Sequence, residues 1–309
     1  MNNRATIFKF TSYKFEPQKK RIVFNYKTEF IGQAPLFFSE TIILPKVPEI
    51  GDVPKELINK LLESLHIILG ISYYKFYCAT KIKLNYKLSK KEADFWDAVY
   101  KNGLGEFFYK NKLDPKMSPK FPFVKKTNHN TSTLKNYNRS LVGIGGGKDS
   151  IVTAELLKAD NFDITGFVVE TGQESKLINK IVKKTGIGGI KIRRILDEKV
   201  YNKHHYDGHI PISSIYAFLG IFSAVLYKYS YFIVGNEYSS NFGNINYKGL
   251  EVNHQWSKSF EFEKMLKDYL DEFISPDVSY FSLMRSFYEI RIVEMFTNYK
   301  KYFSYFSSC

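Results

Sequence analysis

The stretch LVGIGGGKDS, residues Leu141–Ser150, decides the fold of this 309-residue chain. It joins a short apolar run, typical of a buried strand, to three glycines and a Lys-Asp-Ser that opens a helical pattern. Glycines let backbone N–H groups close around an anion, and the positive end of the following helix points to the same place. The sequence therefore predicts a phosphate-binding turn whose contacts are Gly145, Gly146, Gly147, Lys148, Asp149 and Ser150.

Two better-known phosphate motifs do not fit this turn. Walker A requires Ser or Thr after the lysine, but Asp149 follows Lys148, and Val142 stands where the first glycine belongs. The dinucleotide pattern G-x-G-x-x-G, counted from Gly143, would need glycine at position 148. In the turn that remains, Lys148 supplies a positive charge, and Asp149 either caps the helix or contacts a magnesium ion indirectly. The alternative is a turn whose glycines only let a strand and a helix pack closely.

Strands and helices alternate after the turn. Segments 164–170, 190–196 and 231–237 have strand patterns, and segments 149–160 and 174–186 and the apolar stretch from Pro211 have helical ones. Short strands alternating with helices of this length predict a parallel sheet covered on both faces. The fold class is therefore α/β, with a Rossmann-like sheet.

The first 125 residues predict a smaller mixed α+β domain. Segments 21–30 and 81–88 alternate polar and apolar residues as half-buried strands do, and segment 54–69 has one apolar helical stripe. Ser89 and Glu92 form a capping box before a second helix. Segment 126–138 is polar and predicts a linker, which divides the chain into 1–125, 126–138 and 139–309.

The overall composition favours a globular chain in a reducing compartment. The net charge of +14 comes mostly from lysines spread along the chain, so we expect a solvated basic surface and consider nucleic acid an unlikely partner. No apolar stretch approaches about 18 to 20 residues, and the N-terminus lacks a signal-peptide pattern, so we expect a cytoplasmic protein without a membrane span. Cys78 and Cys309 are too few for a disulfide framework. Nothing in the sequence indicates an oligomeric state.

The turn GGGKDS resembles the SGGxDS signature of the PP-loop ATP pyrophosphatases, which cleave ATP between its α and β phosphates and transfer AMP to an oxygen of the substrate. Gly145 stands where that family has Ser. The resemblance implies a Rossmann-like parallel sheet of the PP-loop type, preceded by the smaller mixed α+β domain.

Four further segments resemble the UDP-N-acetylmuramoyl-L-alanyl-L-glutamate epimerases of peptidoglycan precursor synthesis: GISYYK, GLGEFFYKN, GHIPISSIYAFLG and VGNEYSSNFGNINYKGLEVNHQWSKSFEFEK. The resemblance implies an enzyme that uses ATP and Mg²⁺ to invert the terminal L-Glu of UDP-MurNAc-L-Ala-L-Glu through an acyl-adenylate, with AMP and diphosphate released. Adenylation removes the charge of the α-carboxylate and so permits an enolate, which needs electrostatic stabilisation and a positioned acid or base. Family members continue beyond an FSSC-like segment, so we expect domain 139–309 to be incomplete at its C-terminal end.

The same segments supply the remaining candidate site residues. His254 and Lys258 are the leading candidates for contacts to the phosphate or carboxylate groups of the substrate or for proton transfer. Glu237, which follows the last predicted strand, is a further catalytic candidate, and we expect a metal contact from Asp149. A structural histidine, a surface lysine and a helix cap are the competing interpretations. The expected substrate contacts are His209, Asn236, Ser239, Ser240 and Asn253.

Other groups and other functions remain open at this stage. His204, His205, Asp207 and His209 have metal-ligand side chains, but their spacing fits no standard metal site. The alternative functions are another PP-loop enzyme, either a tRNA-modifying thiolase or an amide-forming ligase, and a nucleotide-binding module without catalysis.

Overall fold

The computed structural model describes residues 5–48, 53–125, 131–201 and 206–307. Its strands are β1 (Ile7–Glu16), β2 (Arg21–Glu29), β3 (Leu36–Ile43), β4 (Lys81–Leu84), β5 (Ser140–Gly143), β6 (Ile164–Thr171), β7 (Gly189–Ile195), β8 (Tyr231–Val234), β9 (Ile245–Tyr247), β10 (Leu250–Val252) and β11 (Ser279–Ser282). Its α-helices are α1 (Lys55–Tyr74), α2 (Lys90–Gly103), α3 (Gly105–Lys110), α4 (Lys148–Ala159), α5 (Lys176–Thr185), α6 (Ile212–Leu226), α7 (Phe260–Phe273) and α8 (Glu289–Thr297). The six 3-10 helices include η4 (Tyr238–Asn241) and η5 (Trp256–Lys258).

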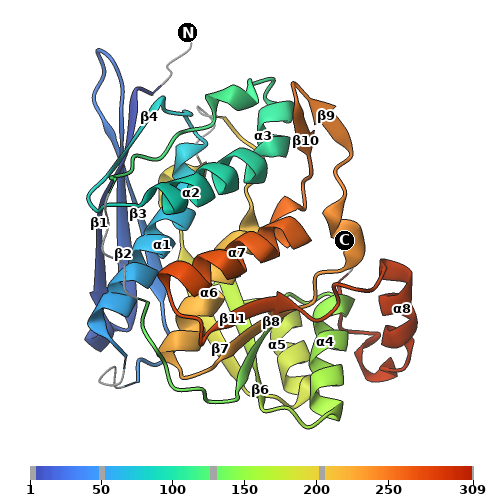
Figure 1. Ribbon diagram of the computed structural model, residues 1–309. Helices are drawn as coiled ribbons and strands as arrows, with labels where there is room; N and C mark the ends of the chain where they lie inside the picture. The colour runs from blue at the N-terminus through green and yellow to red at the C-terminus, as the bar shows by residue number, and fades with distance from the viewer. Residues whose placement is uncertain (1–4, 49–52, 126–130, 202–205, 308–309) are drawn as a thin grey trace.

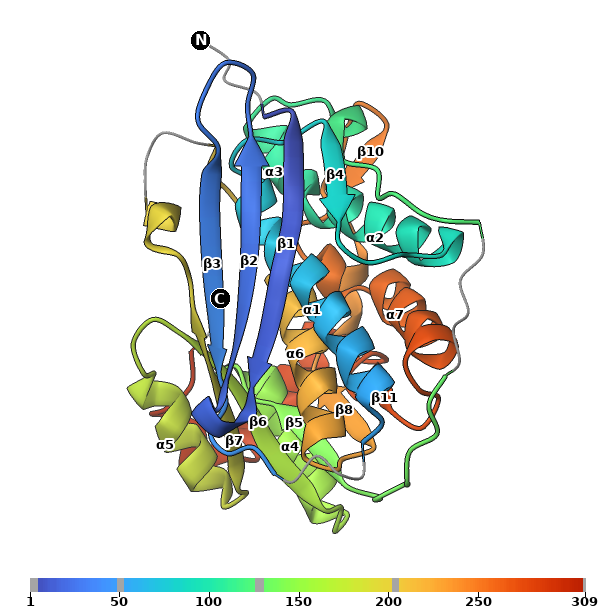
Figure 2. The same cartoon turned by 90° about the vertical axis from the view of Figure 1, so that its left-hand side faces the viewer.

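Within the described residues, one nine-stranded sheet runs through the molecule in the order β11-β8-β5-β6-β7-β3-β2-β1-β4 (Figures 1 and 2). Strands β11, β8, β5, β6 and β7 are parallel to one another. Strands β3, β2 and β1 continue the sheet in antiparallel fashion, and β4 pairs parallel to β1 at the edge. The predicted α/β class with a Rossmann-like parallel sheet is confirmed for the second half of the chain.

The helices form layers around this sheet. Helices α1, α2, α6 and α7 belong to the larger apolar core, which also includes the inward residues of β1, β2 and β3. Helices α4, α5 and α8 lie on the opposite side of the parallel strands and enclose a second core (Figure 1). The parallel strands are thus covered on both faces. Strands β1 to β3 alternate buried and more exposed residues, as their sequence predicts.

A buried ion pair lies where the two halves of the sheet meet. Arg194 of β7 donates from Nε to Glu40 Oε1 of β3 at 2.5 Å, and from one terminal nitrogen to Ser72 Oγ of α1 at 2.7 Å. Arg194 is 2% exposed and Glu40 is 0% exposed, so neither charge has water to stabilise it. Each charge therefore depends on the other, and loss of one partner would leave a buried charge unpaired.

Many local predictions are confirmed, and several elements were missed. Strands β5 to β8, helices α4 to α6 and the capping box at Ser89 are confirmed. In segment 103–111, Gly105–Lys110 forms the separate helix α3 directly after α2. Strands β1, β3 and β11 and the C-terminal helices were not predicted. The division into two domains with a linker stays a prediction, although the sheet itself is continuous from β1 to β11.

Candidate functional site

The glycine turn joins β5 to α4, as the sequence predicts. Only Gly146 of its three glycines has a positive φ, of +94°. Gly147 is the N-cap of α4 and offers no capping side chain, so the first N–H groups of the helix remain available to an anion. Ser150 Oγ donates to Gly147 O at 2.9 Å, which braces the turn from inside.

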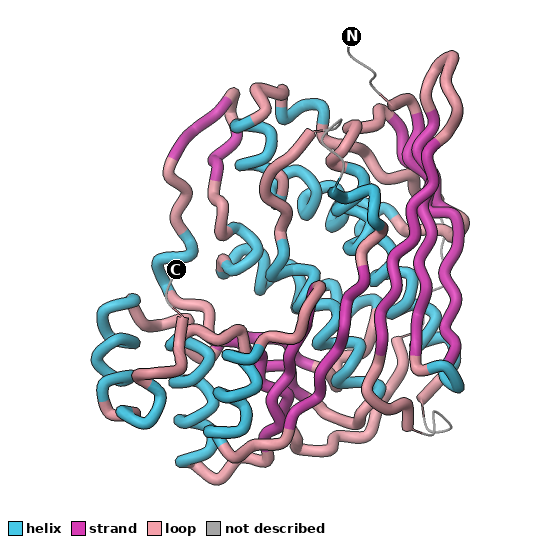
Figure 3. The backbone as a smooth tube through the Cα atoms, turned by 180° about the vertical axis from the view of Figure 1, so that it is seen from behind, coloured by secondary structure: helices cyan, strands magenta, loops and turns pink. Residues whose placement is uncertain are grey.

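A C-terminal segment lies against this turn. Ser307 donates its backbone N–H to Gly146 O at 3.0 Å. The segment ending at Ser307 lies between the β9–β10 hairpin and the helices beside the glycine turn (Figures 1 and 3). The turn is therefore held from within by Ser150 and from outside by Ser307.

A cavity of about 340 Å³ opens beside the turn. Its walls come from the carboxyl ends of β5, β6 and β8, from Tyr216 of α6, and from Asn236 and Lys258. The carboxyl ends of parallel strands are where open α/β sheets bind ligands. We call this space the glycine-turn cavity. It combines apolar walls, suited to a nucleobase, with the N–H groups of the turn.

Four charged side chains surround Asp149 at the edge of this cavity. Burial chiefly raises the pKa of its carboxyl group, while Lys148 and Lys258 lower that pKa and Glu237 and Glu289 raise it. Within the described residues, the buried Asp149 Oδ1 accepts no hydrogen bond, and Lys148 Nζ, at 3.9 Å, is too distant to donate one. An unsatisfied carboxylate oxygen of this kind suits a hydrated Mg²⁺ ion. Asp149 is not the N-cap of α4, so the capping alternative for this residue is wrong.

Gly235 fixes how closely β8 approaches α4, and the sequence analysis missed it. A Cβ at this position would lie 2.8 Å from Asp149 O and 2.7 Å from Thr153 Oγ1. Only glycine lets the chain leave β8 this close to the first turn of α4. Its position directly after an apolar strand, in VGNE, was the available signal.

Two parts of segment 234–264, which resembles the epimerases, meet beside the cavity and are joined by Arg285. Its guanidinium donates to the backbone oxygens of Glu237 at 3.1 Å and Lys258 at 2.7 Å, and to Ser240 Oγ at 3.1 Å. Glu263 accepts from the same guanidinium at 2.7 Å. Arg285 therefore fixes η4 against η5.

Several predicted site residues form part of this framework. Glu237 caps η4 by accepting from Ser239 N at 2.9 Å and from Ser239 Oγ at 2.6 Å. Ser240 donates to Glu237 O, and Asn253 donates to Ser240 O at 2.9 Å. The capping interpretation of Glu237 is confirmed by these contacts. The catalytic and substrate roles of these residues stay predictions.

A second charged cluster brings His209 and His254 together with α3. His209 Nδ1 is 3.9 Å from Glu106 Oε2, and Lys110 Nζ is 2.5 Å from Glu106 Oε1. Burial chiefly lowers the pKa of His209; Glu106 raises it, and His254 and Lys110 lower it further. Burial raises the pKa of Glu106, but Lys110, His209 and His254 together outweigh burial, so the net shift is downward. Glu106 was missed as a site residue, although it lies in the quoted segment GLGEFFYKN.

The histidine-rich group at residues 204–209, whose spacing fits no standard metal site, lies only partly within the described residues. His204 and His205 lie outside them, as does Cys309, and within them no group of three His, Cys, Asp or Glu side chains could hold a metal ion. Asp207 instead pairs with Lys75, at 3.4 Å between its Oδ1 and the lysine Nζ.

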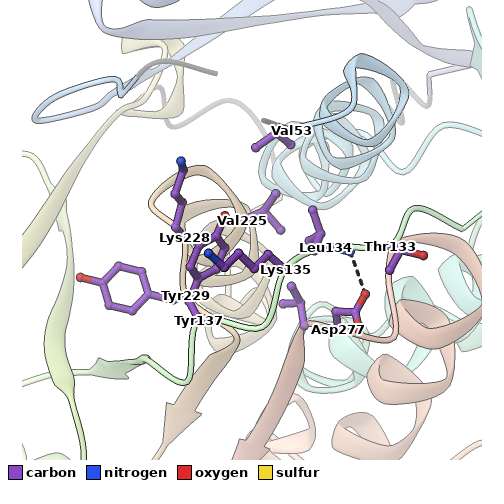
Figure 4. Close-up of a pocket in the computed structure, with 10 residues that line it drawn as sticks. Val53, Thr133, Leu134, Lys135, Tyr137, Val225, Lys228, Tyr229 and Asp277 are labelled. Atoms are coloured by element: carbon purple, nitrogen blue, oxygen red, sulfur yellow. Dashed lines mark hydrogen bonds between the residues drawn. The ribbon is translucent and has the colours of Figure 1, made fainter. Parts of the chain in front are cut away.

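Another cavity, of about 360 Å³, lies at the amino ends of the parallel strands, away from the glycine turn. Segment 133–137 lines it together with the end of α6, and Asp277 accepts from Leu134 N at 2.7 Å (Figure 4). This hydrogen bond attaches the described part of the predicted linker to the loop before β11. None of the predicted site residues lines this cavity.

In the described part of the chain, no helix combines the length and apolar character needed to cross a membrane.

Comparison with known proteins gives three similar epimerases. The chain is 31% identical over 275 residues to the UDP-N-acetyl-alpha-D-muramoyl-L-alanyl-L-glutamate epimerase of Xanthomonas oryzae pv. oryzae, with 87% of this chain and 60% of that protein covered. It is 31% identical over 316 residues to the enzyme of the same name from a Micromonospora species, and 30% identical over 315 residues to that of Salinispora tropica, with 99% of this chain covered in both. The chain spans 60% to 69% of the length of these relatives.

Among solved structures, the chain is similar to a predicted tRNA methyltransferase subunit from Methanocaldococcus jannaschii. The identity is 15% and the TM-score 0.30, over 52% of this chain and 76% of the other. The model of the MurL N-terminal domain family matches residues 1–283, which takes in both the antiparallel strands and the glycine turn. With this match and the three relatives, the chain belongs to the family of the MurL N-terminal domain.

Proposed function

We propose that this chain takes part in the epimerisation of UDP-MurNAc-L-Ala-L-Glu, with ATP and Mg²⁺ bound at the glycine turn. The relatives carry the name of this epimerase, which supports the substrate class. The observation that carries the ATP part is the glycine-turn cavity, in which a strand-to-helix anion turn lies next to the unsatisfied carboxylate oxygen of Asp149.

The proposed reaction begins with activation of the substrate carboxylate. The α-carboxylate oxygen of the terminal L-Glu attacks the α phosphorus of ATP, the bond to the β-phosphate oxygen breaks, and diphosphate leaves. A bound Mg²⁺ ion would neutralise charge on the phosphates. Lys148 and Lys258, which lie around Asp149, would hold the negatively charged groups in place.

Proton transfer at the α-carbon would follow. The acyl-adenylate gives up its α-proton to one group, and the resulting enolate accepts a proton on its opposite face. Water then attacks the acyl carbon, the bond to the AMP oxygen breaks, and AMP and the D-Glu carboxylate are released. His254 and Lys258 remain the candidates proposed from sequence, and the contact of His209 with Glu106 adds a second imidazole near His254. Inversion needs a proton acceptor and a proton donor on opposite faces of the α-carbon, and an imidazole group can serve in either role.

One assay tests this proposal. The chain is incubated with ATP, Mg²⁺ and UDP-MurNAc-L-Ala-L-Glu, AMP is quantified, and the configuration of the glutamate is resolved by chiral chromatography. We expect AMP and D-Glu from the unaltered chain and neither from Lys148→Ala or Asp149→Ala. Lys101→Ala, an exposed lysine of α2, is the matched control and should keep both activities.

The outcomes separate the alternatives. AMP that depends on another acceptor, without inversion, would identify a thiolase or ligase relative. Nucleotide binding without any substrate-dependent AMP would identify a binding module. Either result contradicts the proposed epimerisation.

A further inference from the structure

A cavity of about 560 Å³ lies on the far side of η4 and η5 from the glycine turn. We call it the aromatic cavity, because Tyr238, Phe242, Trp256 and Phe260 line it. Phe242 is 56% exposed and Phe260 is 54% exposed. Exposed rings that gather around one hollow mark a place where another apolar or planar surface is bound.

The rings offer planar faces at suitable spacing. The ring centroids of Tyr238 and Phe242 are 5.5 Å apart with an interplanar angle of 67°, and those of Tyr238 and Tyr288 are 4.7 Å apart with an angle of 60°. Phe260 begins α7, and its backbone N–H donates to Asn241 Oδ1 at 2.7 Å, which fixes the start of the helix against η4. The rings are therefore attached to braced segments, and stacking on them costs little ordering entropy.

The polar lining suits a nucleoside rather than a phosphate group. The described residues that line the aromatic cavity include no lysine or arginine. They do include two acidic residues, Glu251 and Glu261. One carboxylate oxygen of Glu251 accepts a hydrogen bond from Gly243 N, and one of Glu261 accepts from Trp256 Nε1. The second oxygen of each carboxylate can then accept from a ribose hydroxyl. The amide of Asn102 offers a donor and an acceptor, as the imide edge of uracil requires.

The aromatic cavity and the glycine-turn cavity share their dividing wall. Asn236 and Lys258 line the glycine-turn cavity. Tyr238, two residues after Asn236, and Trp256, two residues before Lys258, line the aromatic cavity. Arg285 joins the two segments by its hydrogen bonds to Glu237 O and Lys258 O. A substrate with a nucleoside at one end and a carboxylate at the other can thus reach both cavities around a single braced edge.

We propose that the aromatic cavity binds the uridine end of the substrate, with uracil stacked on the rings and the ribose hydroxyls on Glu251 and Glu261. This inference rests on the proposed function, which supplies the UDP-linked substrate. The apolar walls of the glycine-turn cavity then take the adenosine of ATP, so that the two nucleosides occupy separate places.

The test is a calorimetric titration of the full chain with UDP, with and without an ATP analogue that resists cleavage between the α and β phosphates. We expect UDP to bind equally well in both cases. Phe242→Ala and Phe260→Ala should each weaken UDP binding roughly tenfold and leave the affinity for the analogue unchanged. Phe37→Ala removes a ring that is 59% exposed on β3 and should change neither affinity.

Three results would overturn the inference: no binding of UDP, UDP binding unaffected by both variants, or competition between UDP and the ATP analogue. Thermal melts check that each variant is folded, as expected from the exposure of both rings. AMP formation is measured separately on the unaltered chain. Loss of the proposed function appears there as absent AMP, whereas failure of the uridine site appears as unchanged UDP affinity in the variants.

Discussion

Lys148 of the glycine turn donates to Glu289 at the start of α8, with 2.8 Å between Nζ and Oε1. This contact joins the turn to a helix that was not predicted from the sequence. A phosphate group that enters the turn would compete with the Glu289 carboxylate for the ammonium group, so the ion pair opposes binding of an anion.

Glu289→Gln is therefore expected to tighten binding of an ATP analogue about two- to fivefold, because an exposed ion pair contributes up to about 1 kcal/mol. Titrations at low and high salt measure this change, and the gain should shrink at high salt. Glu294→Gln, in the same helix but paired with Arg291, is the control and should leave the affinity unchanged. Weaker binding by Glu289→Gln would show that the carboxylate helps to hold the nucleotide.

Asp149 is expected to reduce stability at neutral pH while serving the reaction. Its pKa is raised in the folded chain, so the folded state binds more protons than the unfolded state between the ordinary aspartate pKa and the raised one. Stability then falls as the pH rises through that window and stays lower above it. Asp149→Asn should raise Tm at pH 7, and the difference should disappear near pH 4.

The same variant is expected to lower AMP formation by about 10- to 100-fold, because an amide oxygen attracts a hydrated cation less than a carboxylate does. Thermal unfolding from pH 4 to pH 7 and the AMP assay measure the two effects. A lower Tm of Asp149→Asn at pH 7 would contradict the conclusion that burial makes the ionised Asp149 carboxylate destabilising.

Two glycines, one in the turn and one beside it, should differ in their response to substitution. Gly235→Ala places a Cβ against the backbone of Asp149 and is expected to lower the free energy of unfolding by about 1 to 3 kcal/mol and to disturb the turn. Gly145→Ser, which restores the residue of the PP-loop signature, meets nothing within 4 Å and should change stability by less than about 0.5 kcal/mol. Urea denaturation of both variants compares them directly. Equal losses of stability in the two variants would mean that the close approach of β8 to α4 is not the reason why position 235 requires glycine.

Arg285→Lys is expected to keep the charge but lose the planar set of donors that joins Glu237, Lys258 and Glu263. We expect a loss of about 1 to 3 kcal/mol in the free energy of unfolding and a fall of about tenfold in kcat/KM. Arg291→Lys is the control, since Arg291 lies at the surface and pairs only with Glu294 among the contacts described. Equal effects of the two substitutions would argue against a positioning role for Arg285.

The features predicted correctly from the sequence are those that depend on residues close together in the chain. The β5–turn–α4 unit, the capping box at Ser89 and strands β5 to β8 of the parallel sheet follow from local patterns, and the structure confirms them. The pairing of β3 with β7 depends on residues far apart in sequence, for which no local pattern exists.

The candidate site, like the fold, was predictable only where its residues are close together in the sequence. The glycine turn was found because its six residues are contiguous, and the structure places Asn236 and Lys258 in the same cavity wall. Glu106 and Arg285 were missed as site residues because their importance comes from partners more than 20 residues away. In a sequence, Arg285 cannot be distinguished from Arg291, whereas in the structure their contacts differ completely.

The seam between β3 and β7 has a consequence for synthesis of the chain. Glu40 and Arg194 are 154 residues apart, so at about 5 to 20 residues per second the ribosome needs roughly 8 to 30 s to supply the partner strand. During that interval the edge of β3 lacks its neighbour, and the carboxylate of Glu40 lacks its counter-charge. A charged residue on an unpaired edge discourages pairing with other nascent chains, so the residue that later secures the seam also protects the strand before the seam exists.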